Sequence, residues 1–394
     1  MLVGPAFVAA IAYVDPGNFA TNFAGGASFG YELVWVIVAA NLMAMVIQSL
    51  SGKLGLATGQ SLPELCREHY PRPVTRGLWV QAEAVAMATD LAEIIGGAIA
   101  LQLLFDIPLL TGGLITGAVA FGLLGMQSRG FRPFERVISG LLAVIFLGFL
   151  YNIVLVQPDP VGVAAGLVPS FSDVDSVLLA AGILGATVMP HVIYLHSALT
   201  QQRVAAADAP QRRVLLRYQR IDVVVAMGLA GLVNLAMLVI AAELFFGSGI
   251  PDTDTIEGVH AGLQDTLGAT AALAFALALL ASGFASSGVG TYSGQIVMQG
   301  FLRRQIPLVL RRGVAMAPAL IVLALGVDPT QALILSQVVL SFGIPFALVP
   351  LVLLTRRTDI MGELVNRRIT TVVAGVIAAL IIALNLFLLS QFLS

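Results

Sequence analysis

The chain has 394 residues, of which 58% are apolar and only 11% are charged, and its mean hydropathy is +0.95. A soluble protein of this length needs far more charge to cover its surface, so the composition excludes the soluble classes. The single cysteine, Cys66, excludes a disulfide framework and a cysteine metal cluster. We expect no bound cofactor, no nucleic-acid partner and no obligate protein partner.

Apolar runs long enough to cross a bilayer fill almost the whole chain, which indicates one membrane domain over residues 1–394. Charged residues and Gly/Pro-rich stretches separate these runs and predict an all-α integral membrane protein with eleven membrane-spanning helices. The expected spans are residues 4–28, 31–52, 78–105, 108–127, 134–156, 176–200, 218–246, 266–299, 307–326, 330–354 and 369–392.

The basic residues divide unevenly between the two ends of these spans. All 20 lysines and arginines follow the second, fourth, sixth, eighth or tenth span, with Arg311 and Arg312 assigned to the loop after the eighth. By the positive-inside rule these loops are cytoplasmic. We therefore expect a multi-pass protein of the cell (plasma or inner) membrane, with a cytoplasmic N-terminus and an extracytoplasmic C-terminus.

Two expected spans contain a proline in mid-membrane, within VDPGN (Val14–Asn18) and VMPHV (Val188–Val192). Proline has no N–H, so Pro16 leaves the carbonyl of Ala12 without its helical partner, and Pro190 does the same to Ala186. Unsatisfied backbone at this depth is tolerated only inside protein or beside a watery cavity. The sequence therefore predicts two broken helices.

These breaks fall in the first and sixth spans, which stand five spans apart. Paired interrupted helices in corresponding positions of two halves point to the binding site of a transporter. The spacing predicts inverted repeats at about residues 1–156 and 176–354, with an additional helix at about 369–392.

Aligning the two prolines brings the carboxylate of Asp15 opposite the thioether of Met189, with Asn18 one turn beyond. Together with the carbonyls of Ala12 and Ala186, these groups suit a cation, because no lysine or arginine lies nearby. Sulfur favours softer ions, so the pair predicts manganese, iron(II) or cadmium rather than calcium. Met189 serving only as core packing, and Asn18 serving as a helix cap, remain alternatives.

The third span carries Glu83, Asp90 and Glu93, whose separations of seven and three place them on one helical face. Adjacent buried carboxylates raise one another's proton affinity, so the stripe predicts a proton relay. Glu83 has an alternative to a role in the relay: it could lie near the cytoplasmic interface and pair with a loop arginine.

Four further polar residues lie inside expected spans. His191 adjoins the second break and is a candidate for proton exchange, although a packing role is equally consistent. His196 fits a packing role better, while Asn234 and Gln337 are typical of hydrogen bonds between membrane helices.

The motifs DPGN, GATVMPHVIYLHS (Gly185–Ser197) and GTYSGQIVMQGFL (Gly290–Leu302) resemble those of the Nramp family of divalent metal transporters. The resemblance covers nearly the whole chain, although Val192 stands where the family usually has Asn. It implies a leucine-transporter-type fold, alternating access and symport of metal with protons. Eleven spans suit a bacterial manganese importer of this family.

The resemblance also implies roles for particular residues. The implied metal contacts are Asp15, Asn18, Met189 and the Ala186 carbonyl, joined in some states by the Ala12 carbonyl and Gln337. The implied proton route runs through Asp90 and Glu93 toward Glu83, Arg311 and Arg312. We expect Asp15 and His191 to be further members of the proton pathway.

Three other classes compete with this prediction. A sodium-coupled amino-acid transporter would share the fold but would leave Met189 unexplained, and a cation channel would need no alternating access. An intramembrane metalloenzyme is disfavoured because the chain has no HExxH pattern, and His191 and His196 are five residues apart, which splays them on a helix. The prediction is thus a transporter of metal ions and protons in a lipid bilayer, and not an enzyme.

Overall fold

The structure is a computed structural model that describes residues 4–128, 131–201, 209–303 and 307–393. These ranges are helical, with no strand among them. The elements are α1 (Pro5–Ala12), α2 (Pro16–Phe29), α3 (Val34–Thr58), α4 (Leu62–His69), α5 (Arg72–Phe105), α6 (Leu109–Ser128), α7 (Phe131–Val156), α8 (Pro160–Ala165), α9 (Val174–Thr187), α10 (Pro190–Gln201), α11 (Ala209–Leu244), α12 (Ile256–Leu267), α13 (Ala269–Leu302), α14 (Leu308–Ala324), α15 (Pro329–Thr355), α16 (Thr358–Met361), a 3-10 turn η1 (Gly362–Leu364) and α17 (Arg368–Leu393).

Eight stretches of the described chain are long and apolar enough to cross a membrane, which confirms a multi-pass membrane protein. They lie in α3, α5, α7, α9 continued by α10, α11, α13, α15 and α17. The other three expected spans coincide with the interrupted pair α1–α2, with α6 and with the 17-residue α14. The total of eleven crossings stays a prediction.

The assignment of Arg311 and Arg312 to a loop is wrong, because both lie inside α14 and Arg312 is only 2% exposed. Acidic residues of α5 neutralise them there, so they do not need water. Counting charge along the chain cannot detect such pairing between helices.

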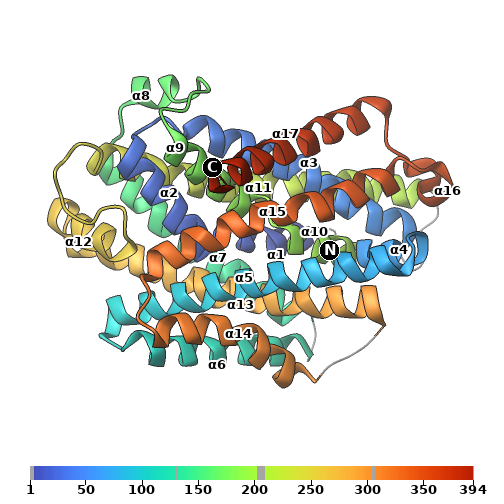
Figure 1. Cartoon of the computed structure of the whole chain (residues 1–394), viewed down its shortest axis with the longest axis horizontal. Helices are drawn as coiled ribbons and strands as arrows, with labels where there is room; N and C mark the ends of the chain where they lie inside the picture. Colours follow the sequence, from blue (N-terminus) through green and yellow to red (C-terminus); the bar gives the residue numbers. More distant parts are fainter. Residues whose placement is uncertain (1–3, 129–130, 202–208, 304–306, 394) are drawn as a thin grey trace.

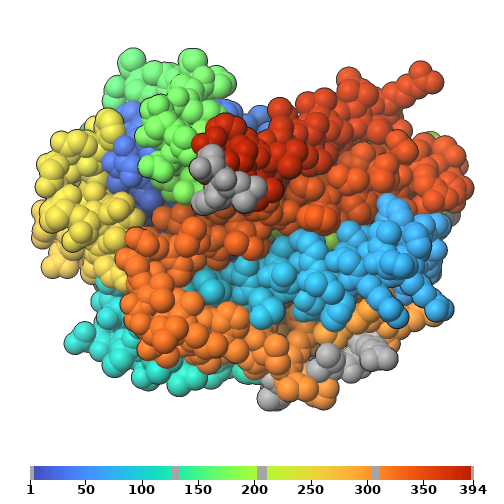
Figure 2. All heavy atoms as spheres, viewed as in Figure 1, coloured from blue at the N-terminus to red at the C-terminus, as the bar shows by residue number. Residues whose placement is uncertain are grey.

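The long helices run side by side along the longest axis of the molecule (Figure 1). The short helices α8 and α12 lie at one end, and α4 and α16 at the other. Figure 2 shows that α5, α14, α15 and α17 supply much of the surface on this face. The apolar window of α9–α10 is 94% buried, whereas that of α17 is 33% buried, so the broken helices are central and α17 is peripheral.

Small residues allow the central helices to approach closely, as is common in membrane proteins. A methyl group added at Gly185 of α9 would lie 1.9 Å from the carbonyl oxygen of Gln337 in α15. One added at Gly283 of α13 would lie 2.9 Å from the backbone of Gly97 in α5. Although rich in Gly and Ser, α13 is a continuous helix of 34 residues, because its small side chains serve packing rather than turns.

We expect Gly185→Ala to destabilise the protein by about 1–3 kcal/mol, because rigid backbone blocks the new methyl group. Thermal unfolding of the purified protein in detergent measures the loss. The matched control is Gly375→Ala in α17, where nothing lies within 4 Å and the helix gains propensity. Equal unfolding temperatures for the two variants would contradict the close α9–α15 contact.

Candidate metal-binding site at the helix breaks

The first break separates α1 from α2 at residues Tyr13, Val14 and Asp15, all buried. Asp15 is the N-cap of α2: its Oδ1 accepts from the Asn18 N–H at 2.9 Å, and Asn18 Oδ1 accepts from the Asp15 N–H at 3.2 Å. This reciprocal capping box satisfies two backbone donors and places the carboxylate at the positive end of the α2 dipole. The cap role considered for Asn18 is therefore present in the structure.

Side chains of neighbouring helices donate hydrogen bonds to the backbone carbonyls that this break leaves without a helical partner. Asn234 of α11 donates to the Tyr13 carbonyl at 2.8 Å, and Ser282 of α13 donates to the Val14 carbonyl at 2.6 Å. Asn234 also accepts from the amide of Asn22 at 2.9 Å, which links α11 to α2. The predicted interhelical role of Asn234 is thus seen, and its target is the break itself.

The second break separates α9 from α10 at Val188 and Met189, and both side chains are fully buried. The Ala186 carbonyl lies in the last turn of α9, as expected from the missing donor at Pro190. On the other side of the break, Ser293 of α13 donates to the His191 carbonyl at 2.7 Å, and Ser51 of α3 donates to the Ile193 carbonyl at 2.6 Å.

Two close contacts bring further elements to the first break. A methyl group at Gly17 would lie 2.0 Å from Gln337 Nε2, so the side chain of Gln337 in α15 rests on the start of α2. A methyl group at Gly96 would lie 2.0 Å from the ring of Pro16, so α5 presses on the same turn. The structure thereby joins Asp15, Asn18 and Gln337, which stand far apart in the sequence.

Several buried polar atoms around the two breaks make no hydrogen bond with the described residues. They are Asp15 Oδ2, Asn18 Nδ2, Thr187 Oγ1, His191 Nε2 and Gln337 Oε1. Such atoms are rare in folded proteins because each costs about 1–3 kcal/mol when it is left unpaired. Thr187, at the end of α9, was not among the residues predicted from sequence, and only its position beside the break could have identified it.

No group of three or more His, Cys, Asp or Glu side chains suited to a metal ion occurs in the described part of the chain. A cation at the breaks must therefore use the single carboxylate of Asp15 with neutral groups. The candidates are the amide oxygens of Asn18 and Gln337, the Met189 thioether and the Ala12 and Ala186 carbonyls. An amide oxygen has two lone pairs, so Asn18 Oδ1 can keep its cap and still bind a cation.

The acidic stripe of α5 meets the arginines of α14. Arg312 Nη1 pairs with Asp90 Oδ1 at 2.7 Å, and Arg311 Nη2 pairs with Glu83 Oε2 at 3.1 Å. Arg312 also donates to Ser287 and Thr291 of α13. For Glu83 the sequence left open a pairing with a loop arginine. Glu83 does pair with an arginine, but this residue, Arg311, lies in the helix α14.

Glu93 differs from the other two acids, because it is fully buried and neither carboxylate oxygen has a partner among the described residues. It packs against the backbone of Gly290, where a methyl group would lie 2.7 Å from its Oε1. Gly96 follows Glu93 by three residues, so Glu93 lies one helical turn from the contact between α5 and Pro16. It therefore lies between the break and the Asp90–Arg312 pair along α5.

The two histidines of α10 have different surroundings. His191 Nδ1 lies 3.2 Å from Thr89 Oγ1 of α5, on the side of the acidic stripe. His196 Nδ1 lies 2.8 Å from Gln48 Oε1 of α3, and Gln48 donates to the Tyr13 hydroxyl at 2.5 Å. His196 therefore belongs to a buried network beside α1, in agreement with a packing role.

Asp222 of α11 is a buried acid that sequence reasoning missed. Its carboxylate accepts from the N–H groups of Gly4 and Ala6 at 3.0–3.1 Å, so it caps α1 from another helix. Its signal in the sequence was a carboxylate near the start of an expected membrane span, two residues after Arg220.

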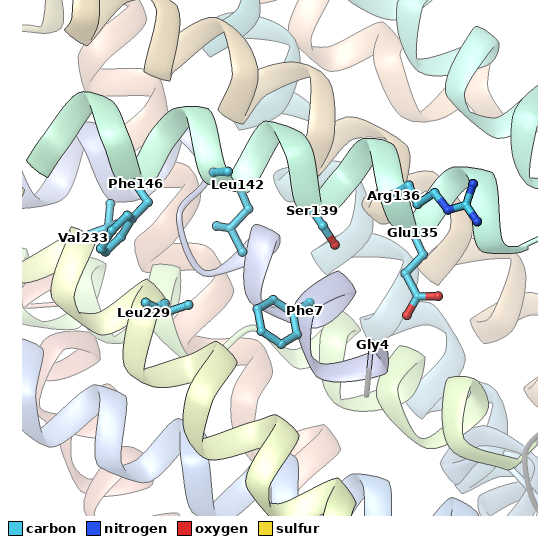
Figure 3. Close-up of a pocket in the computed structure, with 10 residues that line it drawn as sticks. Gly4, Phe7, Glu135, Arg136, Ser139, Leu142, Phe146, Leu229 and Val233 are labelled. Carbon is cyan, nitrogen blue, oxygen red and sulfur yellow. The ribbon is translucent and has the colours of Figure 1, made fainter. Parts of the chain in front are cut away.

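A cavity of about 780 Å³ lies beside α1, between α7 and α11, and none of the residues at the breaks lines it. Figure 3 shows Phe7, Leu142 and Leu229 directed into the space between the three helices, with Glu135 and Arg136 at one end. The short helix α1 is therefore held at its N-terminus by Asp222 and has open space on one flank.

Comparison with known proteins agrees with this architecture. Residues 6–391 match the family model described as natural resistance-associated macrophage protein-like, Nramp. The chain is 54% identical over 391 residues to the divalent metal cation transporter MntH of Deinococcus radiodurans, covering 99% of this chain and 90% of the relative. It is 51% identical over 391 residues to MntH of Bacillus subtilis, covering 98% and 91%.

Solved structures of two transporters also resemble this chain. The manganese transporter of Eremococcus coleocola, in complex with an aromatic bis-isothiourea substituted compound, superposes with a TM-score of 0.88 at 34% identity, covering 98% of this chain and 86% of that one. Mhp1, a nucleobase-cation-symport-1 family transporter, superposes with a TM-score of 0.63 over 98% of this chain and 91% of that one, at 14% identity, which shows the fold alone.

The expected all-helical, leucine-transporter-type fold is confirmed, with its first and sixth spans interrupted. The chain is a transporter and not an enzyme, and it belongs to the Nramp family.

Proposed function

We propose that this protein imports divalent transition metals, Mn²⁺ and Fe²⁺ and also Cd²⁺, by alternating access coupled to protons. The observation that carries the proposal is the set of unpaired buried polar atoms at the two helix breaks and on Gln337 beside the first. Asp15 supplies the charge, and the neutral oxygens and the Met189 sulfur complete the ligand set. The names of the relatives, divalent metal cation transporter and manganese transporter, support this substrate class.

The structure disfavours a sodium-coupled amino-acid transporter. Such a transporter directs the N-terminus of a half-helix at the carboxylate of its substrate. Here the N-terminus of α2 is already capped by the Asp15 carboxylate, which would repel a second one. A transported cation is attracted by the same group.

Proton coupling is assigned to α5. Glu93 lies nearest the break, and beyond it the Asp90–Arg312 and Glu83–Arg311 pairs continue along the helix. Arginines already pair with Asp90 and Glu83, whereas Glu93 has no arginine partner among the described residues, so we assign the transferred proton to Glu93. His191 joins the stripe through Thr89.

Alternating access is assigned to the broken helices, with α1 moving against α7 and α11. The cavity on its flank supplies space, and the Asp222 cap holds its N-terminus until that contact opens. We place the protein in the cell membrane, with the N-terminus cytoplasmic and the C-terminus outside, on the distribution of basic residues.

We expect Asp15→Ala to abolish saturable manganese uptake into proteoliposomes, because the variant removes the only charge at the breaks. Asp265→Asn, an exposed acid on α12, is the control and should transport normally. Calcium and magnesium serve as competitors, and size-exclusion chromatography verifies folding. Uptake by Asp15→Ala at the parent rate would refute the site.

Glu93→Gln should make manganese uptake independent of an imposed pH gradient while leaving manganese binding intact. The change removes a proton acceptor without altering shape, whereas Asp90→Asn would also leave Arg312 buried and unpaired. Uptake is measured with and without a pH gradient, and binding of Mn²⁺ is measured directly. Together they separate a loss of proton coupling from a loss of metal binding. An unchanged gradient dependence would exclude Glu93 from the coupling route.

Met189→Ala should change selectivity more than overall transport. Every divalent cation interacts with the charge of Asp15, but only softer ions gain from a sulfur ligand. Cadmium uptake should fall most and manganese uptake less, while calcium should compete better. The control is Met227→Ala, which removes an equally buried methionine of α11. A uniform loss for all three ions would show that Met189 only packs.

A further inference from the structure

A basic cleft of about 710 Å³ lies beside α3, and no residue of the helix breaks lines it. It is formed by the second half of α3, the first half of α11, η1 and the start of α17. Figure 1 places α16, and with it this corner, at the same end of the molecule as α4. This is the end expected to face the cytoplasm.

The charge of this cleft is strongly unbalanced. Among its described lining residues, the cations are Lys53, Arg213, Arg220 and Arg367 and the one acid is Glu363, which gives these residues a net charge of +3. Glu363 pairs with Arg213 at 3.0 Å, and both side chains are more than half exposed, so this pair is weak. The other three cations form no ion pair with the described residues.

Lys53 is unusual because it is a buried cation without a counter-ion. Its side chain is 6% exposed, and its ammonium donates to the side-chain oxygen of Asn366, a neutral partner. Asn366 is fixed in turn by Thr355 at the end of α15, through its N–H at 3.1 Å and its amide at 2.8 Å. A buried charge is expensive unless it is paired, so this arrangement points to an anion in the cleft.

The start of α17 adds to the attraction for an anion. This helix of 26 residues begins at Arg368, so its first-turn N–H groups and the positive end of its dipole lie beside the cleft. The other walls are apolar and include Val46, which is partly exposed, and Val224 and Ile369, which are exposed. A site with a cationic end and an apolar wall in a membrane protein suits an amphipathic anion.

We propose that this cleft binds an anionic phospholipid, with its phosphate near Lys53, Arg220 and the N-terminus of α17. The acyl chains then lie along Val224 and Ile369. This site goes beyond the transport function and does not depend on it. Anionic lipids are abundant in the cytoplasmic leaflet, where clusters of Lys and Arg attract them.

The test is native mass spectrometry of the full chain with phosphatidylglycerol and with phosphatidylcholine of the same acyl chains. The parent protein should retain phosphatidylglycerol in preference. Each cation near a membrane surface contributes about fivefold in affinity, so Arg220→Gln/Arg367→Gln should weaken phosphatidylglycerol binding about 25-fold. Both arginines are exposed, so folding should be preserved.

The matched control is Arg72→Gln/Arg76→Gln, which removes two exposed arginines from the start of α5, outside the cleft. It should change phosphatidylglycerol binding less than about twofold, because long-range attraction alone is screened. An equal loss in both double variants, or no preference for phosphatidylglycerol, would overturn the proposal. Displacement of the lipid by an equal concentration of inorganic phosphate would also overturn it, because a free phosphate would then be the occupant.

Discussion

The structure depends on satisfying the backbone of two helices that stop in the middle of a bilayer. Asp15 and Asn18 cap the first break from within, while Asn234 and Ser282 reach its carbonyls from α11 and α13. Because lipid offers no hydrogen bonds, each of these partners must lie on a helix packed directly against the break. The surrounding helices are therefore positioned by the hydrogen bonds that the breaks require.

Close packing makes these contacts possible and leaves particular atoms without partners. Glycines at positions 17, 96 and 185 let α5, α9 and α15 approach until backbone and side chains touch. The amide of Gln337 reaches α2 only because residue 17 has no side chain. A carboxylate oxygen, amide groups and a hydroxyl are left unpaired at this junction, and these are the groups to which we assign the metal ion.

The charges away from the breaks follow a different principle. Two arginines of α14 are held by Asp90 and Glu83, so the α5 stripe is neutralised wherever it is paired. Glu93 lies outside these pairs and nearest the break, so one helical face carries both an unpaired acid and two structural ion pairs. The basic cleft at α17 shows the reverse condition, because Lys53, Arg220 and Arg367 form no ion pair with the described residues.

Much of this protein was determined by its sequence alone. Hydropathy predicted the membrane helices, and the prolines at positions 16 and 190 predicted both breaks, because a missing N–H is a local property. The sequence did not reveal that Arg312 is buried against Asp90, or that Asp222 caps α1. Nor did it reveal that Thr187 has an unpaired hydroxyl at the second break, or that Lys53 lies in a cleft without an ion-pair partner among the described residues. These features were decided by tertiary structure, because each depends on which helices pack together, and hydrophobic periodicity records only that a face is buried.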